Sequence, residues 1–452
     1  MPGRDLGFRS ACRGLTPAAL GLIAALAASP ADAMDIQRVR SAGGIEAWLV
    51  ESHANPLIAM RFAFLGGAAQ DPAGKEGLAY FVSGMMDEGA GDLDSIAFQE
   101  RLQGLAMRLD FDAGRDVMLG NVQMLSANRD EGFELLRLAL TAPRFDATAI
   151  ERVRAQILAG LKFDENDPEE VASLAWDRIA FPGHPYGRPV KGTMASIAAI
   201  NRDDLKGYVE RVYARDKLVI AVVGDIDAET LGPLLDKTFG GLPEHSVLAP
   251  IADVKPPLGP LREVIEMDVP QSVAKFGHRG LARKDDDFMA AYVLNYIIGG
   301  GGFSSRLMEE VREKRGLAYS VHSNLHPYRH GAVFVGHVAT QNERVGQSLD
   351  VIENELKRLA AEGPTAEELA NAKSYLTGSY PLRFETSSGI ANQLLWIQIE
   401  ELGIDYVNER NKLIENVSLD DIKRVAKRLI EADRLITTIV GKPVASAKAA
   451  PG

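Results

Sequence analysis

Apolar and polar positions follow two different periods along this chain. Residues 57–65 (LIAMRFAFL) and 218–224 (LVIAVVG) have the short apolar pattern of β-strands, whereas residues 148–158 (TAIERVRAQIL) place apolar side chains at helical spacing. Strand-like segments of this kind come in groups with helices between them. The pattern predicts an α+β fold, in which an antiparallel sheet is covered by helices on one face.

The same order of elements occurs twice. The strand-like residues 218–224 (LVIAVVG) are matched by residues 435–441 (LITTIVG), at an offset of 217 residues. The helical patterns that open at Thr148 and Thr365 have the same offset. Two halves of about 210 residues each have the size of single domains, so we predict two homologous domains.

A proline-rich segment separates the two halves. Residues 241–260 contain five prolines and show neither a helical nor an alternating period. We expect the two domains to close on each other as a clamshell with a groove between them. The predicted division is a signal peptide at 1–33, an N-terminal domain at 34–242, a linker at 243–260, a C-terminal domain at 261–442 and a tail at 443–452.

The first 33 residues have the pattern of a signal peptide. Three arginines precede the apolar run 15–28, and Ala31-Asp32-Ala33 forms a small-residue cleavage motif. A membrane anchor is the alternative, but the run is short for a bilayer span. A mitochondrial presequence would be amphipathic, whereas this run is uniformly apolar. We therefore expect export, a periplasmic location and no stable membrane insertion after cleavage.

Charge and cysteine content exclude some classes of function. The 452 residues include 50 Lys and Arg against 62 Asp and Glu, which gives a formal net charge of −12. Loss of residues 1–33, with three arginines and two aspartates, changes this charge to −13. We expect no nucleic-acid partner, because a polyanion is bound by a basic surface. The one cysteine, Cys12, precedes the predicted cleavage site, so no disulfide or Cys-based zinc site is expected.

Residues 299–321 (GGGGFSSRLMEEVREKRGLAYSV) form the most informative segment of the second half. Four consecutive glycines disfavour a helix interior, so we predict a loop whose backbone approaches another chain closely. A capped helix should follow and end at Gly316, and a strand should begin after it. The glycines expected to contact a substrate are Gly299, Gly300, Gly301 and Gly302.

Arg312 and Tyr319 lie on either side of the turn at Gly316, so their side chains can converge. A guanidinium and a phenol side by side are suited to holding a peptide carbonyl or stabilising an oxyanion. The structural alternative is that Arg312 pairs with Glu309 or with helix carbonyls, and that Tyr319 is a half-buried strand residue. A phosphate-binding loop is disfavoured, because GGGGFSSR lacks the G-K-[ST] ending.

The string SSRLMEEVREKRGLAYSV, residues 304–321, resembles the C-terminal domain of the pitrilysin, insulinase and mitochondrial processing peptidase superfamily. In these zinc peptidases, the arginine and tyrosine at the positions of Arg312 and Tyr319 contact the substrate backbone and the reaction intermediate. The family is built from duplicated α+β halves that form a clamshell. The resemblance covers residues 36–441.

The resemblance implies a zinc motif, H-x-x-E-H, on the first long helix of the N-terminal half, where two histidines bind zinc and the glutamate activates water. The corresponding helix has Tyr80, Ser83 and Gly84 at these three positions. The third ligand, a glutamate in the family, falls at Ala159 or Gly160. None of these side chains suits zinc chemistry. We therefore interpret Tyr80, Ser83, Gly84 and Gly160 as a zinc site that has been lost.

Three histidines offer an alternative metal site. His322, His326 and His330 are spaced by four residues, as on a helix face. However, Pro327 interrupts them, and they follow the strand-like residues 317–321. A solvated hairpin is therefore favoured over a metal site. A self-sufficient peptidase with zinc at these histidines is the least favoured of the functions considered.

The sequence thus retains one half of a peptidase site and lacks the other. We interpret the chain as a non-zinc-binding subunit of an exported heteromeric zinc peptidase, inactive alone, with no cofactor of its own. Arg312 and Tyr319 would act on a peptide substrate at a zinc ion held by a homologous partner that carries H-x-x-E-H. The alternative is a non-catalytic peptide-binding or scaffolding clamshell, which would hold an extended peptide at a sheet edge.

Overall fold

The computed structural model describes residues 34–443 of the chain. The predicted signal peptide at 1–33 lies outside these residues, as does all but the first residue of the predicted tail. Within residues 34–443, no helix is long and apolar enough to cross a membrane. The elements described below all belong to one compact unit.

The first half contains a six-stranded sheet with the strand order β1-β2-β6-β3-β5-β4. Its neighbours are antiparallel except for the parallel pair β2 and β6. The strands are β1 (Gln37–Arg40), β2 (Glu46–Glu51), β3 (Leu57–Leu65), β4 (Arg108–Ala113), β5 (Val117–Leu125) and β6 (Leu218–Gly224).

Eight helices accompany this sheet in the described part of the chain, and most contribute apolar residues to one continuous core. They are α1 (Leu78–Ser83), α2 (Ser95–Gly104), α3 (Arg129–Thr141), α4 (Ala147–Asp164), α5 (Pro168–Ala180), α6 (Met194–Ala199), α7 (Arg202–Val212) and α8 (Ala228–Phe239).

The second half repeats this plan with a five-stranded sheet of order β7-β11-β8-β10-β9. Again one pair, β7 and β11, is parallel and the others are antiparallel. The strands are β7 (Leu261–Glu266), β8 (Gln271–Arg279), β9 (Ala318–Tyr328), β10 (Gly331–Gln341) and β11 (Ile436–Gly441).

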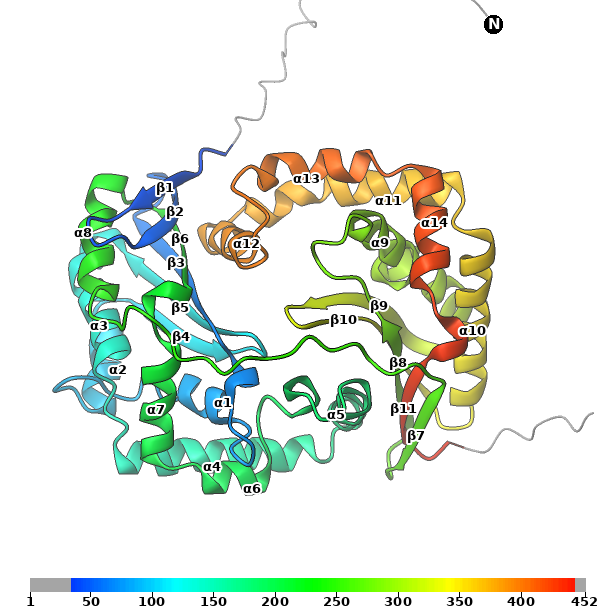
Figure 1. Cartoon of the computed structure of the whole chain (residues 1–452), viewed down its shortest axis with the longest axis horizontal. Helices are drawn as coiled ribbons and strands as arrows, with labels where there is room; N and C mark the ends of the chain where they lie inside the picture. Colours follow the sequence, from blue (N-terminus) through cyan, green and yellow to red (C-terminus); the bar gives the residue numbers. More distant parts are fainter. Residues whose placement is uncertain (1–33, 444–452) are drawn as a thin grey trace, which may run out of the picture. The chain divides into compact units, whose positions relative to one another are not determined.

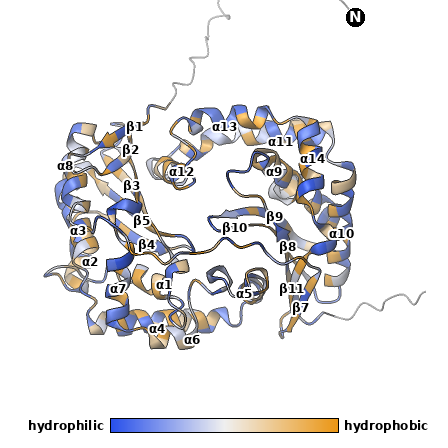
Figure 2. Cartoon of the chain, viewed as in Figure 1, coloured by the Kyte–Doolittle hydropathy of each residue, from blue (hydrophilic) through white to orange (hydrophobic). Residues whose placement is uncertain are grey.

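Its helices are α9 (Phe288–Asn295), α10 (Val345–Glu362), α11 (Ala366–Gly378), α12 (Ser387–Ile399), α13 (Tyr406–Glu415) and α14 (Leu419–Leu429). Helix α14 shows the expected amphipathic pattern, with both hydrophobic and hydrophilic positions visible in Figure 2 and four apolar residues buried: Ile422, Val425, Ala426 and Leu429. The predicted α+β fold with two sheets is confirmed. Residues 240–260 form no helix or strand, and the predicted domain boundaries stay a prediction.

Each sheet is also packed against a helix from the other half. Helix α5 lies on β8 and β11, and α12 lies on β3 and β6 (Figure 1). The Trp176 indole Nε1 donates a hydrogen bond to the Ile436 carbonyl at 3.0 Å, and the Thr438 hydroxyl donates to the Ala172 carbonyl at 2.9 Å. On the other sheet, the Gln398 side chain donates to the Ile220 carbonyl at 3.1 Å. The helices therefore join the two halves.

Replacing Trp176 should destabilise the whole fold. Its side chain is 1% exposed and packs in an apolar cluster with Phe181, Val333 and Ile436. Trp176→Ala should lower the free energy of unfolding by about 3–5 kcal/mol, because it leaves a cavity and removes the indole donor. Leu174→Ala on the same helix, where the side chain is 43% exposed, should cost less than about 1 kcal/mol. Urea denaturation of both variants measures the difference, and equal stability would contradict this role of α5.

Candidate functional site

The helix that carries Tyr80 and Ser83 is fixed at its N-terminus by Asp71. The Asp71 carboxylate accepts hydrogen bonds from the backbone N–H groups of Gly77, Leu78 and Ala79 at 2.9, 3.1 and 3.0 Å. These groups have no partner within the helix, so the acidic side chain caps α1. Gly77 has a φ of +89°, and a Cβ there would lie 2.7 Å from the Lys191 carbonyl oxygen.

The four positions predicted to be a lost zinc site lie together. Tyr80, Ser83 and Gly84 from the α1 region and Gly160 from α4 line one cavity of about 450 Å³. Phe111 and Asp112 of the edge strand β4 line the same cavity. The sequence left Ala159 and Gly160 as alternatives, and Gly160 is the one that lines this cavity.

The four glycines of the second half differ from the predicted loop. Gly299 and Gly300 continue α9 as a π-helical turn, Tyr296–Gly300, and Gly302 begins a short 3₁₀ turn with a φ of +57°. A loop over all four residues was therefore wrong. The reason for glycine is close packing, because a Cβ on Gly299 would lie 2.6 Å from the Ser323 backbone nitrogen.

A second π-helical segment, Met308–Glu313, carries Arg312. It ends as predicted at Gly316, which has a φ of +60° and donates its N–H to the Arg312 carbonyl at 2.8 Å. Such segments widen a helix by one residue per turn and are frequent at functional sites.

A β-bulge sets the direction of the Tyr319 side chain. On β10, Ala339 pairs with Ser320 and the next residue, Thr340, pairs with Ala318, so Tyr319 is the extra residue of β9. Bulges of this kind re-aim a side chain at the edge of a sheet. The Tyr319 side chain is accordingly 76% exposed, which excludes the half-buried alternative.

The Arg312 guanidinium lies against two aromatic rings. Its central carbon is 5.0 Å from the centre of the Tyr319 ring and 4.8 Å from that of Phe303, a residue that is itself 70% exposed. Its ion-pair contact within residues 34–443 is with Glu313 at 3.5 Å. The alternative pairing with Glu309 is not formed, because Glu309 pairs with Lys314 at 2.9 Å. The guanidinium is thus oriented by stacking, with donors left over for a ligand.

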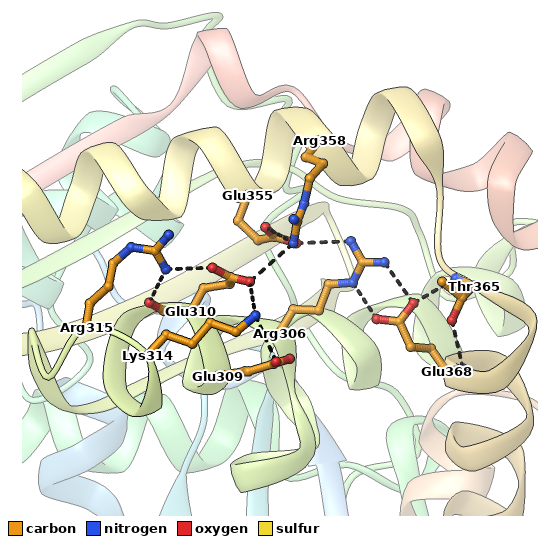
Figure 3. A network of polar contacts seen from close by, with 9 residues as sticks. All are labelled: Arg306, Glu309, Glu310, Lys314, Arg315, Glu355, Arg358, Thr365 and Glu368. Atoms are coloured by element: carbon orange, nitrogen blue, oxygen red, sulfur yellow. Dashed lines mark hydrogen bonds and ion pairs between the residues drawn. The ribbon is translucent and has the colours of Figure 1, made fainter.

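A network of ion pairs holds residues 306–315 on α10 and α11 (Figure 3). Arg306 donates to Glu355 at 3.0 Å and, in bidentate fashion, to Glu368 at 2.5 and 2.7 Å. Glu310 accepts from Lys314 at 2.8 Å and from Arg315 at 2.6 Å. The sequence analysis missed this network, because its partners lie up to 62 residues apart and share no local pattern.

The histidines lie as the hairpin prediction expected. His322 and His326 are on β9, and His330 is in the turn to β10, so this prediction is confirmed. Across residues 34–443, no group of three or more His, Cys, Asp or Glu side chains is placed to hold a metal ion.

The structure does not bring the two parts of the expected site into one cavity. The cavity at Tyr80 is lined by residues between 80 and 191, all from the first half. Arg312 and Tyr319 are not among these residues, although they do contact each other. Phe303 was not predicted to be a site residue. The feature of the sequence that could have indicated it is an aromatic residue directly after the four glycines, and the structure shows that this residue is exposed.

Comparisons with known proteins point to one family. The model of the peptidase M16 inactive domain matches residues 199–376. The chain is 29% identical over 395 residues to the non-peptidase homolog YmxG of Helicobacter pylori, covering 86% of this chain and 90% of that protein. It is 26% identical over 408 residues to an uncharacterized zinc protease of Mycobacterium leprae, covering 87% and 90% of the two chains.

A solved structure extends this similarity. A peptidase M16 inactive domain from Pseudomonas fluorescens matches with a TM-score of 0.85 and 28% identity, covering 92% of this chain and 99% of that one. The chain is similar to M16 peptidase-family proteins over most of its length. This is the family that the segment around Arg312 and Tyr319 resembles.

The M16 fold implies zinc, but the residues at the corresponding place do not fit it. Zinc in proteins is bound by imidazole, thiolate or carboxylate groups. Tyr80 offers a phenol, Gly84 and Gly160 offer no side chain, and the Ser83 hydroxyl donates to the Tyr80 carbonyl at 2.8 Å. The similarity to the M16 inactive domain agrees with this chemistry.

The ion-pair network makes the stability of this chain depend on pH. Burial of Glu310 opposes its ionisation, but the hydrogen bonds from Lys314 and Arg315 outweigh this and lower its pKa from 4.5 to about 2. Stability from this group is therefore present above pH 4.5 and is lost as the pH falls toward 2. Glu310→Gln should lower the free energy of unfolding at pH 7 by about 2 kcal/mol and flatten its decline between pH 4.5 and 2.

The matched control is Glu309→Gln in the same helical segment. Its side chain is 56% exposed and pairs with the same lysine, so the substitution should cost less than about 1 kcal/mol. Denaturant unfolding of the three proteins from pH 2.5 to 7 gives both quantities. An equally steep decline in Glu310→Gln and in the parent chain would show that Glu310 is not the titrating group.

Proposed function

We propose that this chain is the non-zinc-binding subunit of an exported heteromeric zinc peptidase. In this proposal, Arg312 and Tyr319 bind and polarise the substrate at a zinc ion held by a homologous partner with the H-x-x-E-H motif. The observation that carries it is the arrangement of Arg312, which lies against the rings of Phe303 and Tyr319 with its side chain 28% exposed.

The chemistry of this pair favours a role at a reaction centre. A guanidinium and a phenol held by stacking lose little freedom when they bind a peptide carbonyl, and both can donate to the oxyanion that forms when water attacks it. Donors of this kind accelerate hydrolysis only beside an activated water. Since the side chains at Tyr80, Ser83, Gly84 and Gly160 do not suit zinc, the metal and its water would come from the partner.

The proposed setting is the periplasm. It rests on the signal-peptide pattern of residues 1–33, and it would place the partner and the peptide substrate in the same compartment.

A second candidate is a peptide-binding chain that takes no part in hydrolysis. It is favoured by the edge strands β4 and β9, each of which contributes residues to a cavity: Phe111 and Asp112, and Asn324 and Leu325. An extended peptide can add to such an edge through main-chain hydrogen bonds. The relative YmxG of Helicobacter pylori is named a non-peptidase homolog.

Reconstitution with an H-x-x-E-H homologue tests the proposal. The purified chain alone should bind no zinc and cleave no peptide, and mixing should give activity that a chelator removes. Tyr319→Phe should then lower kcat by about 10²–10³-fold, the usual loss for one oxyanion donor, with assembly unchanged. Peptide-cleavage kinetics and analytical ultracentrifugation give these two quantities.

Tyr375→Phe is the matched control, because Tyr375 is a 59% exposed tyrosine of the same half, stacked on Tyr296. It should leave kcat within about twofold. Full turnover in Tyr319→Phe would remove that residue from the mechanism. Peptide binding without any zinc-dependent turnover in the mixture would favour the second candidate.

A further inference from the structure

A second cavity, in the other half of the chain, has a strongly basic lining. It measures about 290 Å³ and lies among residues of α9, β9, α12 and α13. Three arginines line it, and they come from three separate segments: Arg283, Arg383 and Arg410. Glu400 is the one acidic side chain in its lining.

Arg410 is buried without a carboxylate partner. The residue is 4% exposed, and its guanidinium donates to the Leu376 carbonyl at 3.0 Å, to the Asn411 side-chain oxygen at 3.0 Å and to the Tyr292 hydroxyl at 3.3 Å. All three acceptors are neutral. It lies over the Tyr380 ring at 4.2 Å, and no acidic group of residues 34–443 lies within ion-pair distance. A buried positive charge without an anion is costly, so an anionic ligand would stabilise this one.

Arg306 of the same half is a largely buried arginine whose charge is neutralised by ion pairs, and it serves as a comparison for Arg410. Its side chain is 11% exposed, similar in burial to Arg410, but it pairs with both Glu355 and Glu368. Arg283, which also lines the cavity, has neutral neighbours as well: it donates to the Tyr406 hydroxyl at 2.8 Å and lies 4.5 Å from the Phe288 ring centre. Neither Arg283 nor Arg383 forms an ion pair within the described residues.

Glu400 does not neutralise this charge. It forms no ion pair within residues 34–443, and burial raises the pKa of its carboxyl above the ordinary value, although Arg283 opposes this. The cavity therefore keeps an excess of positive charge. An anionic ligand would bring the missing negative charge.

The lining also contains apolar side chains, beside polar ones such as Asn295, Asn324 and Gln393, and the apolar ones restrict the ligand further. Between the arginines lie the following side chains: Met289, Leu325, Trp396, Ile397 and Leu402. Such walls favour an apolar or aromatic group beside the anion, and planar guanidinium groups favour a planar carboxylate.

The internal repeat relates this cavity to the one at Tyr80. Residues 78–83 (LAYFVS) of α1 align with residues 290–295 (AAYVLN) of α9 at an offset of 212, which places Tyr292 opposite Tyr80. Asn324 of β9 then corresponds to Asp112 of β4. The duplicated fold thus provides a cavity beside each equivalent helix, and the second one has acquired arginines.

The basic cavity continues into a larger one. A cavity of about 590 Å³ lined by both halves shares Arg283, Trp396 and Glu400 with it. The larger cavity also includes Arg115 from the first half and Tyr328 from β9. A peptide whose C-terminus binds in the basic cavity therefore has room for its preceding residues in the larger cavity.

The geometry points to a binding site for a carboxylate that carries an apolar or aromatic group, with Arg283 and Arg410 as its donors. Two sources share this chemistry, the C-terminal residue of a peptide and a free small carboxylic acid. The site is independent of the proposed zinc partner, because all of its residues belong to this chain.

Calorimetric titration of the full purified chain tests the site. The probes are N-acetyl-phenylalanine, a hexapeptide that ends in phenylalanine, and the C-terminal amides of both. Both acids should bind at least tenfold more tightly than their amides. Hexapeptide affinity at least tenfold above that of N-acetyl-phenylalanine identifies a peptide C-terminus as the ligand, and equal affinities identify a small acid.

Arg283→Gln should weaken binding of the acids at least tenfold and leave binding of the amides unchanged. Arg262→Gln, an exposed arginine of β7 outside the cavity, is the matched control and should change neither. Arg410→Gln is a secondary test because it is buried, and its folding is checked by circular dichroism first. Equal binding of acids and amides, no binding of either acid, or unchanged affinity in Arg283→Gln would overturn the inference.

Discussion

The exchange of helices between the two sheets is the contact on which the rest of the structure depends. The strands β6 and β11 are almost wholly buried along their length, so each needs cover on both faces. Helices of the same half supply one layer, and α12 or α5 of the other half supplies the second. Hydrogen bonds from Trp176 and Gln398 to strand carbonyls fix the register of this packing. Neither sheet is fully covered by helices of its own half. The packing of the two halves on each other is therefore part of the fold.

The duplicated fold allows chemistry to change without loss of the core. Most of the apolar residues that bury the sheets lie outside the cavities at Tyr80 and at Arg410, and only a few, among them Val153 and Ile157, belong to both a core and a cavity. At the first cavity, a phenol, a hydroxyl and two glycines stand where zinc chemistry needs imidazole and carboxylate groups. At the second, three arginines provide positive charge instead. The polar and charged residues of the two cavities therefore differ, while the two halves keep one order of elements.

Local patterns predicted the elements well, and contacts between distant residues account for what they missed. The repeat of LVIAVVG as LITTIVG located two equivalent strands, and the turn at Gly316 followed from its position after a helical period. The glycines from Gly299 were misjudged, because helix propensity disfavours glycine whereas the close approach of Ser323 requires it. The bidentate pairing of Arg306 with Glu368 and the arginine cavity both join segments far apart in sequence. No periodicity of a single segment contains that information.

The arginines of the second half differ in what holds each of them in place. Arg306 and Arg312 lie six residues apart in one segment, and both are partly buried. Two carboxylates take up the donors of Arg306, so its charge is neutralised and its role is to hold α10 and α11. Arg312 is instead oriented by the rings of Phe303 and Tyr319, which attract its charge without using its N–H groups. A guanidinium held in this way can still donate to a ligand. Arg410 differs from Arg306 in another way, because its three acceptors are neutral and its charge has no ion pair within residues 34–443.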